Sequence, residues 1–411
     1  MKLKVSKRIL VVCQHFWPES FRINDLCDGF IENGLEVDVL CGQPNYPKGE
    51  WYKGYGPFSN RRQKHRGINI YRTFEIKRGN NSKLRICMNY LSFIFSSLLH
   101  VPGLLKNHYD KIFIYELSPV YMAWAGILIG RLKKVEIITC VMDLWPENLY
   151  SVIPFKNKII RNILMRSSTW IYRKSDKLVC LTESEVDLLK ERTGKSRDAF
   201  CVIPQSCEKI YETPIYDDII INRFGGRFNV VFAGNINRAQ DFPIMLDAAE
   251  QLSREGYPIH WIIVGDGMLR KDIECDVFER GLAEIFSFEG FLPIEDIPKY
   301  TPVASCLVAC LIKSPHVECA IAAKVFSYIA SGRPIVLAMD GEAGKLINEN
   351  GCGFAGPSGD AKVLAENIKR IYNLTDEERE FMGKQAKKLH FERFERNISL
   401  RKMIKFMFNI K

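Results

Sequence analysis

The stretch RILVVCQHFWPESFRINDLCDGFIENG, residues 8–34, contains the pattern that decides the fold. Its first part, 8–13, is a short apolar run with the length of a buried strand. Polar and aromatic residues then lead into 20–33, where apolar side chains recur every three to four residues, as on one face of a helix that ends at Gly34. Strand, loop and helix in this order form one βα unit of a parallel sheet.

The same alternation of apolar runs and helical segments repeats along the chain. A first series of further strands is expected at 36–40, 69–73, 111–115, 136–141 and 177–181. A second series is expected at 228–233, 259–264, 285–288, 304–311 and 334–338. Because helical segments separate the strands in both series, the pattern predicts an α/β protein with two doubly wound, Rossmann-like domains.

The length of 411 residues also favours two cores of about 200 residues each. The strand pattern is interrupted by a polar, irregular segment that ends in a glycine pair, which is typical of a linker. We assign a first domain to 1–210, a linker to 211–226, a second domain to 227–395 and a C-terminal helix to 396–411. That helix is a candidate to pack back on the first domain.

Composition and charge narrow the class of protein. Hydrophobic residues make up 47% of the chain and charged residues 26%, which is enough apolar material for two cores. The 13 cysteines lack CxxC pairs and zinc-ligand spacing, and the basic N-terminus lacks a cleavage site, so the sequence favours the cytoplasm. A net charge of +10 without a nucleic-acid-binding motif predicts anionic small molecules or lipid headgroups as partners, and no nucleic acid.

An uncharged stretch of 20 residues, 86–105, is long enough to span a bilayer. Polar residues dilute it, however, and four basic residues precede it: Lys77, Arg78, Lys83 and Arg85. We expect a buried helix, or one that lies at an anionic membrane surface, rather than a spanning helix.

Ligands of open parallel sheets bind at the carboxyl ends of the strands, so the loops at those ends are the candidate sites. The loop after the first strand carries His15, Glu19 and Arg22. It continues to Asn24 at the start of a helix, whose N-terminus favours anions. Arg22 is suited to hold a phosphate with two parallel hydrogen bonds, although a solvated Arg at a helix start is an equally simple explanation.

A second loop of this domain, 142–147, carries Asp143 and Glu147 on either side of a Trp-Pro turn. Paired carboxylates can accept sugar hydroxyls or stabilise positive charge at an anomeric carbon. An Asp at this place is also a common helix N-cap, so the loop alone does not identify the chemistry.

The second domain has two glycine-containing turns of the same kind. FAGNI, 232–236, places Gly234 after a strand, where glycine lets a backbone approach a pyrophosphate that Arg238 can neutralise. VGDGML, 264–269, is a second such turn, which an ordinary tight turn explains equally well.

A further segment of that domain, 316–334, places Glu318, Lys324 and Ser327 close to a helix start. Lys324 in a first helical turn opposes the helix dipole, a destabilisation that an anionic ligand would offset.

Seven segments together resemble glycosyltransferase family 4, in particular its bacterial O-antigen and capsule branch, which includes N-acetyl-fucosamine transferases. These segments are HFWPESFRINDL (15–26), GQPNYPKGE (42–50), ELSPV (116–120), DLWPE (143–147), FAGNINRAQ (232–240), IVGDGMLR (263–270) and AAKVFSYIASGRPIV (322–336). The resemblance implies a GT-B fold, with two Rossmann-like domains facing each other across a cleft. It also implies a nucleotide-sugar donor held by the second domain, retention of anomeric configuration, and no metal or other cofactor.

The resemblance implies roles for individual residues. Residues that would act on the sugar are Asp143, Glu147 and Glu19. Residues that would bind substrate in the first domain are Arg22, Asn24 and His15. Residues that would hold the donor in the second domain are Gly234, Asn235, Arg238, Gly265, Phe288, Glu318, Lys324 and Ser327.

The sequence departs from the family pattern in two places. Asn235 and Gln240 stand where many members carry the Arg and Lys of the pyrophosphate loop. Ser327 stands where the second Glu of a paired-glutamate motif contacts the donor ribose. A serine can still hydrogen-bond a hydroxyl, though less strongly than a carboxylate.

The predicted activity is metal-independent hexosyl or N-acetyl-hexosaminyl transfer to a lipid-linked oligosaccharide, at the inner face of a bacterial membrane. The donor is expected to be UDP-linked, with an N-acetylated deoxyhexose as a candidate sugar. Two alternatives keep the fold: a nonhydrolysing sugar-nucleotide epimerase, and an inactive nucleotide-sugar-binding subunit of a partner enzyme. Ser327 and the missing pyrophosphate cations favour the inactive subunit.

Overall fold

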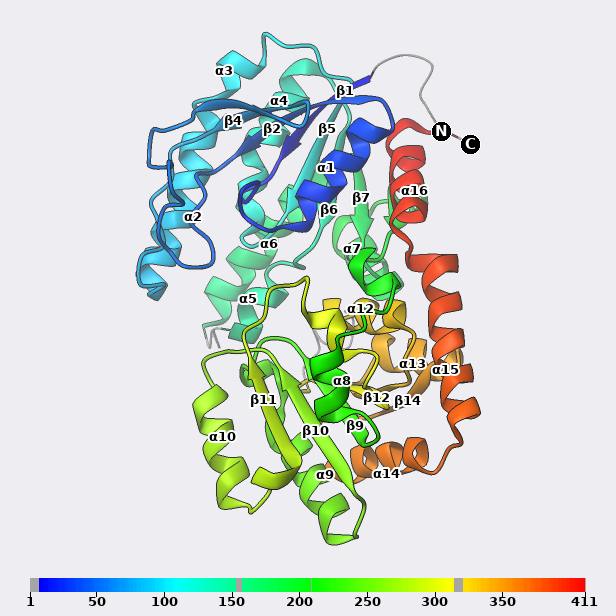
Figure 1. Ribbon diagram of the computed structural model, residues 1–411. Helices are drawn as coiled ribbons and strands as arrows, with labels where there is room; N and C mark the ends of the chain where they lie inside the picture. The colour runs from blue at the N-terminus through cyan, green and yellow to red at the C-terminus, as the bar shows by residue number, and fades with distance from the viewer. Residues whose placement is uncertain (1–6, 153–156, 208, 314–320, 411) are drawn as a thin grey trace. The chain divides into compact units, whose positions relative to one another are not determined.

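The computed structural model describes residues 7–152, 157–207, 209–313 and 321–410 (Figure 1). The chain divides into two compact units. The first consists of Met1–Ile203 together with Leu400–Lys411, and the second is Pro204–Ser399. Each unit contains its own sheet and its own apolar cores.

The first unit has an eight-stranded sheet in the order β3-β4-β2-β1-β5-β6-β7-β8. All neighbouring strands are parallel except β3, which runs antiparallel to β4. Strand order reverses between β1 and β5, which marks this point of the carboxyl edge as a place for ligands. The strands are β1 (Lys7–Val12), β2 (Leu35–Cys41), β3 (Arg62–His65), β4 (Ile68–Arg72), β5 (Lys111–Glu116), β6 (Ile137–Val141), β7 (Lys177–Cys180) and β8 (Phe200–Val202).

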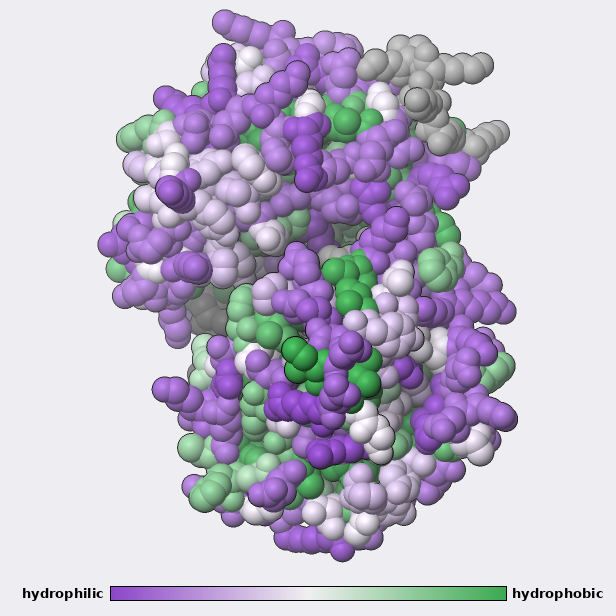
Figure 2. Space-filling view, viewed as in Figure 1, coloured by the Kyte–Doolittle hydropathy of each residue, from purple (hydrophilic) through white to green (hydrophobic). Residues whose placement is uncertain are grey.

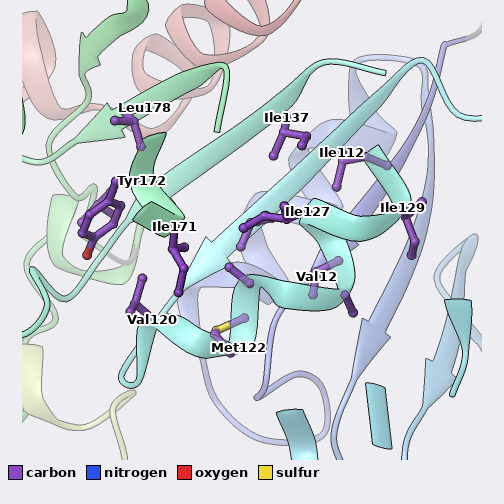
Figure 3. Packing of buried hydrophobic residues seen from close by; sticks show 14 of the residues in the cluster. Val12, Ile112, Val120, Met122, Ile127, Ile129, Ile137, Ile171, Tyr172 and Leu178 are labelled. Carbon is purple, nitrogen blue, oxygen red and sulfur yellow. The ribbon is translucent and has the colours of Figure 1, made fainter. Parts of the chain in front are cut away.

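Helices cover both faces of this sheet, as the two apolar clusters show. One cluster joins the sheet to α2 (Lys83–Leu98), α3 (Val101–Leu104), α4 (Trp124–Lys133), α6 (Lys158–Lys174) and α7 (Glu183–Thr193). Figure 3 shows part of it, with Ile127 and Ile129 of α4 pointing toward the strands. The other cluster joins the sheet to α1 (Arg22–Glu32) and α16 (Arg396–Phe408). A short helix, α5 (Glu147–Val152), follows β6.

The second unit has a six-stranded, fully parallel sheet in the order β11-β10-β9-β12-β13-β14. Its strand order reverses between β9 and β12. The strands are β9 (Phe228–Ala233), β10 (Ile259–Val264), β11 (Phe286–Gly290), β12 (Cys306–Cys310), β13 (Ile335–Ala338) and β14 (Gly353–Gly356). The helices are α8 (Asp218–Phe224), α9 (Phe242–Arg254), α10 (Arg270–Glu279), α12 (Ala323–Ser331), α13 (Glu342–Glu349), α14 (Ala361–Tyr372) and α15 (Asp376–Leu389).

The predicted α/β class and all eleven predicted strands are confirmed. Three strands that the sequence analysis missed are edge strands: β3 and β8 in the first sheet and β14 in the second. The predicted linker, 211–226, contains α8, and Phe224 of that helix is buried in the second unit. Along the chain the division instead falls after Ile203.

The C-terminal helix α16 joins the first unit. Its Leu400, Met403 and Met407 are buried against the same cluster as α1. The Lys177 ammonium at the start of β7 donates to the Phe406 carbonyl at 2.8 Å and to the Asn409 side-chain oxygen at 2.7 Å. The surface seen in Figure 2 is largely hydrophilic, with hydrophobic residues in smaller patches.

Candidate functional site

Two glycines follow neighbouring strands at the carboxyl edge of the second sheet. Gly234 comes directly after β9 and Gly265 directly after β10. A Cβ added to Gly265 would lie 1.9 Å from the Gly234 carbonyl oxygen, and one added to Gly234 would lie 2.7 Å from the Lys324 Nζ. Only glycine permits this approach. The two predicted glycines therefore bring bare backbone and one ammonium group together.

Lys324 is the second residue of α12, and its ammonium is enclosed by neutral groups. Its Nζ donates to the Gln240 side-chain oxygen and lies 3.8 Å from the centroid of the Phe232 ring. Burial lowers the pKa of Lys324 to about 7. Among the described residues, no carboxylate forms an ion pair with it. An anion placed here would meet a cation that the protein itself leaves uncompensated.

Two residues that the sequence analysis did not assign to the site hold Lys324 in place. Tyr328, one helical turn later, accepts a hydrogen bond from the Ala233 N–H at 2.9 Å and donates to the Val308 carbonyl at 3.2 Å. These bonds fix α12 to the end of β9. Gln240, noted only as a departure from the family pattern, is the partner of Lys324. The i, i+4 spacing of Lys324 and Tyr328 is a signal that was available in the sequence.

The other donor-site predictions fall at different places. Arg238 and Asn235 are exposed, Arg238 on the 3-10 turn Arg238–Gln240. Phe288 lies in β11, where its half-buried ring packs against the apolar cluster of the second unit. Ser327 is buried in the middle of α12 rather than at its start. Glu318 lies outside the described residues.

In the first unit, Glu19 joins two loops at the carboxyl edge of the sheet. One of its oxygens accepts the N–H groups of Asn45 and Tyr46, both at 2.7 Å. The other lies 3.0 Å from His15 Nδ1. Glu19 is 1% exposed, so all of its accepting capacity is directed into the protein. These bonds give Glu19 a structural role in joining the two loops, and its predicted role at the sugar stays a prediction.

His15 and Asn24 belong to the same buried arrangement. His15 is stacked on Phe21, with ring centroids 4.7 Å apart, and its Nε2 lies 3.3 Å from the Arg78 guanidinium. The Asn24 side chain accepts from the Trp17 N–H at 2.9 Å and donates to the Glu19 carbonyl at 2.7 Å. Asn24 thus braces the loop that was predicted to bind substrate.

Asp143 and Glu147, the predicted carboxylate pair, differ in how they are engaged. Asp143 is half-buried, and one of its oxygens accepts the Ser118 N–H at 3.1 Å. Glu147 begins α5, where both of its oxygens accept from Arg192 at 3.1 Å. This ion pair ties Glu147 to α7, and its predicted role at the sugar stays a prediction. Arg22 and Asp143 both lie close enough to Tyr115 for their charges to act on the pKa of that phenol, which burial raises.

Two buried carboxyl groups near this edge were missing from the sequence analysis. Burial raises the pKa of Glu116, at the end of β5, well above its usual range, and the charge of Asp143 adds to this shift. Burial likewise raises the pKa of Glu75 to about 8, although Gln14 donates to it at 2.6 Å. A single acidic residue at the end of an apolar run was the available signal for Glu116.

The carboxyl group of Glu75 fills a space that Gly42 leaves open. A Cβ added to Gly42 would lie 2.0 Å from Glu75 Oε2. In the part of the chain that the structure describes, this oxygen is buried and has no hydrogen-bond partner. The same Gln14 amide that donates to Glu75 also donates to Asn89 at 2.9 Å. A neutral, protonated Glu75 fits these surroundings better than an ionised one.

We predict that Glu75→Gln changes the pH dependence of unfolding. Wild-type Glu75 stays protonated in the fold up to about pH 8 but ionises near its ordinary pKa when unfolded, so its contribution to stability is lost as pH rises between these values. The glutamine does not titrate. Between pH 5 and pH 8, the difference in unfolding free energy should therefore move in favour of the variant by roughly 3 to 4 kcal/mol.

Urea denaturation at both pH values measures this difference, with Glu279→Gln on the exposed side of α10 as the control. Parallel pH profiles for wild type and Glu75→Gln would contradict a protonated Glu75.

Known proteins resemble this chain in the sequence of its second unit and in its whole fold. Residues 218–389 match the family model described as glycosyl transferases group 1. A relative from Pseudomonas aeruginosa, named as the probable glycosyltransferase WbjE, is 26% identical over 73% of this chain and 76% of its own length.

Solved structures match nearly the whole chain. Sucrose-phosphate synthase from Thermosynechococcus elongatus has a TM-score of 0.74 at 14% identity, covering 98% of this chain and 99% of that one. Anabaena Alr3699/HepE in complex with UDP has a TM-score of 0.71 at 13% identity, covering 98% and 100%. These likenesses show the GT-B fold. The chain therefore has the GT-B fold of glycosyltransferases, and its second unit matches the glycosyl transferases group 1 model.

Proposed function

We propose that this protein transfers a sugar, with retention of configuration, from a UDP-linked donor to a lipid-linked oligosaccharide in the synthesis of a bacterial O-antigen or capsule. The observation that carries the donor half is Lys324, whose ammonium lies beside the Gly234 backbone without a carboxylate partner among the described residues. The relative named WbjE and the UDP complex of HepE support a nucleotide-sugar of this kind. An N-acetylated deoxyhexose is the proposed sugar.

In the proposed mechanism, Lys324 binds the diphosphate while the Gly234 and Gly265 backbones lie against it. As the bond between the anomeric carbon of the sugar and the diphosphate breaks, negative charge grows on the leaving diphosphate. A fixed ammonium stabilises that charge without having to reorganise. Arg238, exposed on its 3-10 turn, supplies a second cation that can reach outward. Tyr328 and Gln240 act as positioning residues for Lys324.

For the sugar itself, Asp143 is the proposed contact in the first unit. Its carboxylate is half-buried, and one of its oxygens accepts a hydrogen bond from the Ser118 N–H. Glu19 and Glu147 support the loops around it through their own hydrogen bonds. We therefore assign the sugar contact to Asp143 alone among the three predicted carboxylates.

The acceptor half of the proposal places the enzyme peripherally at the inner, anionic face of the membrane, with its bulk in the cytoplasm. None of the described helices is long and apolar enough to cross a bilayer. Four basic residues were expected at the membrane, and two of them are engaged within the protein. Lys77 pairs with Glu50, and Arg78 is buried against Asn89. Lys83 and Arg85, at the start of α2, are exposed and stay candidates.

We predict that UDP binding takes up a proton through Lys324. At pH 8 the free protein holds Lys324 largely neutral, since its pKa is about 7. A bound diphosphate favours the charged form, so binding should take up about 0.5 to 1 proton and weaken as pH rises above 7. Calorimetry in buffers of different ionisation enthalpy measures this uptake.

Two substitutions of Lys324 distinguish the effect of its positive charge on UDP binding from the effect of its proton uptake. Lys324→Ala should weaken UDP binding by about 1 to 3 kcal/mol, because one charge-assisted contact is lost. Lys324→Arg should bind UDP without the proton uptake, because a guanidinium stays charged. The exposed Lys345→Ala on α13 serves as the control. Equal proton uptake in wild type and Lys324→Arg would sink the assignment.

Chelation is expected to leave sugar transfer largely intact. In this proposal Lys324 and Arg238 supply the positive charge that a divalent ion supplies in metal-dependent transferases. Activity measured with and without EDTA tests the idea. Loss of transfer in EDTA that magnesium or manganese restores would refute metal independence.

The transfer reaction should add one sugar to a lipid-linked oligosaccharide. Mass spectrometry of lipid extracts from cells with and without the gene should show a shift by one sugar residue. Epimerised donor without glycosidic product would indicate a nonhydrolysing epimerase instead. UDP binding without any product would indicate an inactive binding subunit.

A further inference from the structure

Helix α2 carries a continuous apolar stripe on its exposed side. Its inner side is anchored by buried residues such as Phe93 and Ile94. Successive turns on the outer side expose large apolar side chains, which are Leu84, Met88, Leu91, Phe95 and Leu99. Leu84 is 71% exposed, Phe95 60% and Leu99 81%. At about 1.5 Å per residue, the stripe extends for about 22 Å, and no acidic residue occurs between Lys83 and Leu105.

Helix α4 widens this apolar surface. It packs beside α2 on the same face of the first sheet, so side chains that point away from the core emerge on the same side of the unit. Its exposed residues Trp124, Leu128 and Leu132 repeat every four positions and continue the pattern. Exposed apolar area of this extent marks an interaction surface rather than the scatter of an ordinary protein exterior.

A basic pocket lies at the end of the stripe where Leu99 is found. Its volume is about 800 Å³, and it is formed by strands β3 and β4 and by the segment from the end of α2 through α3. Its polar lining consists of Arg61, Arg62, Tyr71, His100, Lys106 and Asn107. In Figure 1, α2 and α3 lie at the outer side of the first unit, away from α16.

The three cations of the pocket have no acidic counterpart. Among the residues that the structure describes, no carboxylate forms an ion pair with Arg61, Arg62 or Lys106. The pocket residue Asn107 donates to Asp38 at 3.4 Å, but both oxygens of Asp38 already accept from Arg8, at 2.9 and 3.1 Å.

The positive charge of the pocket acts on the pKa of a neighbouring histidine. Burial, together with the charges of Arg61 and Arg62, lowers the pKa of His100. The Arg62 guanidinium also lies 5.9 Å from the centroid of the Tyr71 ring. A phosphate group would offset this excess charge and accept bonds from the guanidinium fork.

Basic groups at both ends of the stripe define its orientation. Lys83 and Arg85 flank Leu84, and the pocket flanks Leu99. For both groups to reach one layer of anionic headgroups, the helix must lie flat, with the apolar side chains between them in the acyl boundary. A helix tilted into the bilayer would carry one basic cluster into the hydrocarbon.

We propose that the Arg61, Arg62 and Lys106 pocket binds the headgroup phosphate of an anionic phospholipid, while the α2 stripe inserts flat into the same leaflet. This inference deepens the membrane partner of the proposed function and rests on it. The shared phosphate chemistry would also admit a free phosphate ion, but only a phospholipid explains why the apolar stripe ends at the pocket. The pocket thus fixes which face of the first unit meets the membrane.

Vesicle co-sedimentation tests this proposal on the full chain, with phosphatidylcholine vesicles that either lack or contain phosphatidylglycerol. Each basic residue at an anionic surface contributes about fivefold to binding. Arg61→Ala, Arg62→Ala and Lys106→Ala together should therefore reduce partitioning to phosphatidylglycerol vesicles by about 100-fold. The matched control removes three exposed lysines of the second unit, Lys271, Lys345 and Lys362, and should change partitioning by less than about twofold. Equal losses in both variants would overturn the pocket.

A second variant distinguishes a phosphate site from diffuse attraction. Arg61→Lys with Arg62→Lys keeps the charge but removes the bidentate fork, so binding to phosphatidylglycerol vesicles should fall by about tenfold. Unchanged binding would overturn the assigned phosphate contact. Inorganic phosphate should release more protein than chloride at equal ionic strength, and equal release would count against the site. UDP affinity, measured for every variant, should stay unchanged, so that a failure of donor binding is distinguishable from a failure of membrane binding.

Discussion

The close approach of two strand ends, at Gly234 and Gly265, is the constraint on which the candidate donor site depends. Adjacent parallel strands place their carboxyl ends side by side, and any side chain at these positions would collide with backbone or with Lys324. The glycines also leave room for the ammonium group, which is then surrounded by an amide, an aromatic ring and bare backbone. A charge in such surroundings is kept at a cost in stability, and its depressed pKa expresses that cost.

The first unit uses the opposite arrangement at its own strand ends. There acidic groups are buried, and they are satisfied in different ways. Glu19 accepts hydrogen bonds that join two loops, whereas burial raises the pKa of both Glu75 and Glu116 because it disfavours their ionised forms. Buried acidic groups thus mark the strand ends of the first unit, whereas in α12 of the second unit the Lys324 ammonium has no carboxylate partner among the described residues. This difference suits a unit that recognises neutral hydroxyl groups and another that recognises a diphosphate.

Sequence reasoning recovered the central strands because each is a buried apolar run between turn residues. It missed β3 and β14 since their sequences, RQKH and GFAG, are polar or glycine-rich and pair only at sheet edges. Lys324 was found because a lysine in a first helical turn conflicts with the helix dipole. The hydrogen bonds of Glu19 and Arg78 could not be predicted from the sequence, because their partners lie in loops that are distant in the chain. Asn45 is such a partner for Glu19, and His15 for Arg78.

The position of α16 has a consequence for how the chain acquires its structure during synthesis. The strands of the first unit are synthesised early. Helix α16, which packs in the same cluster as α1, is synthesised only after the entire second unit. Until α16 emerges, the apolar cluster to which it contributes Leu400, Met403, Ile404 and Met407 lacks these side chains. The second unit, whose segments are contiguous, can complete its core first. The first unit therefore completes its core only after the whole second unit has been synthesised.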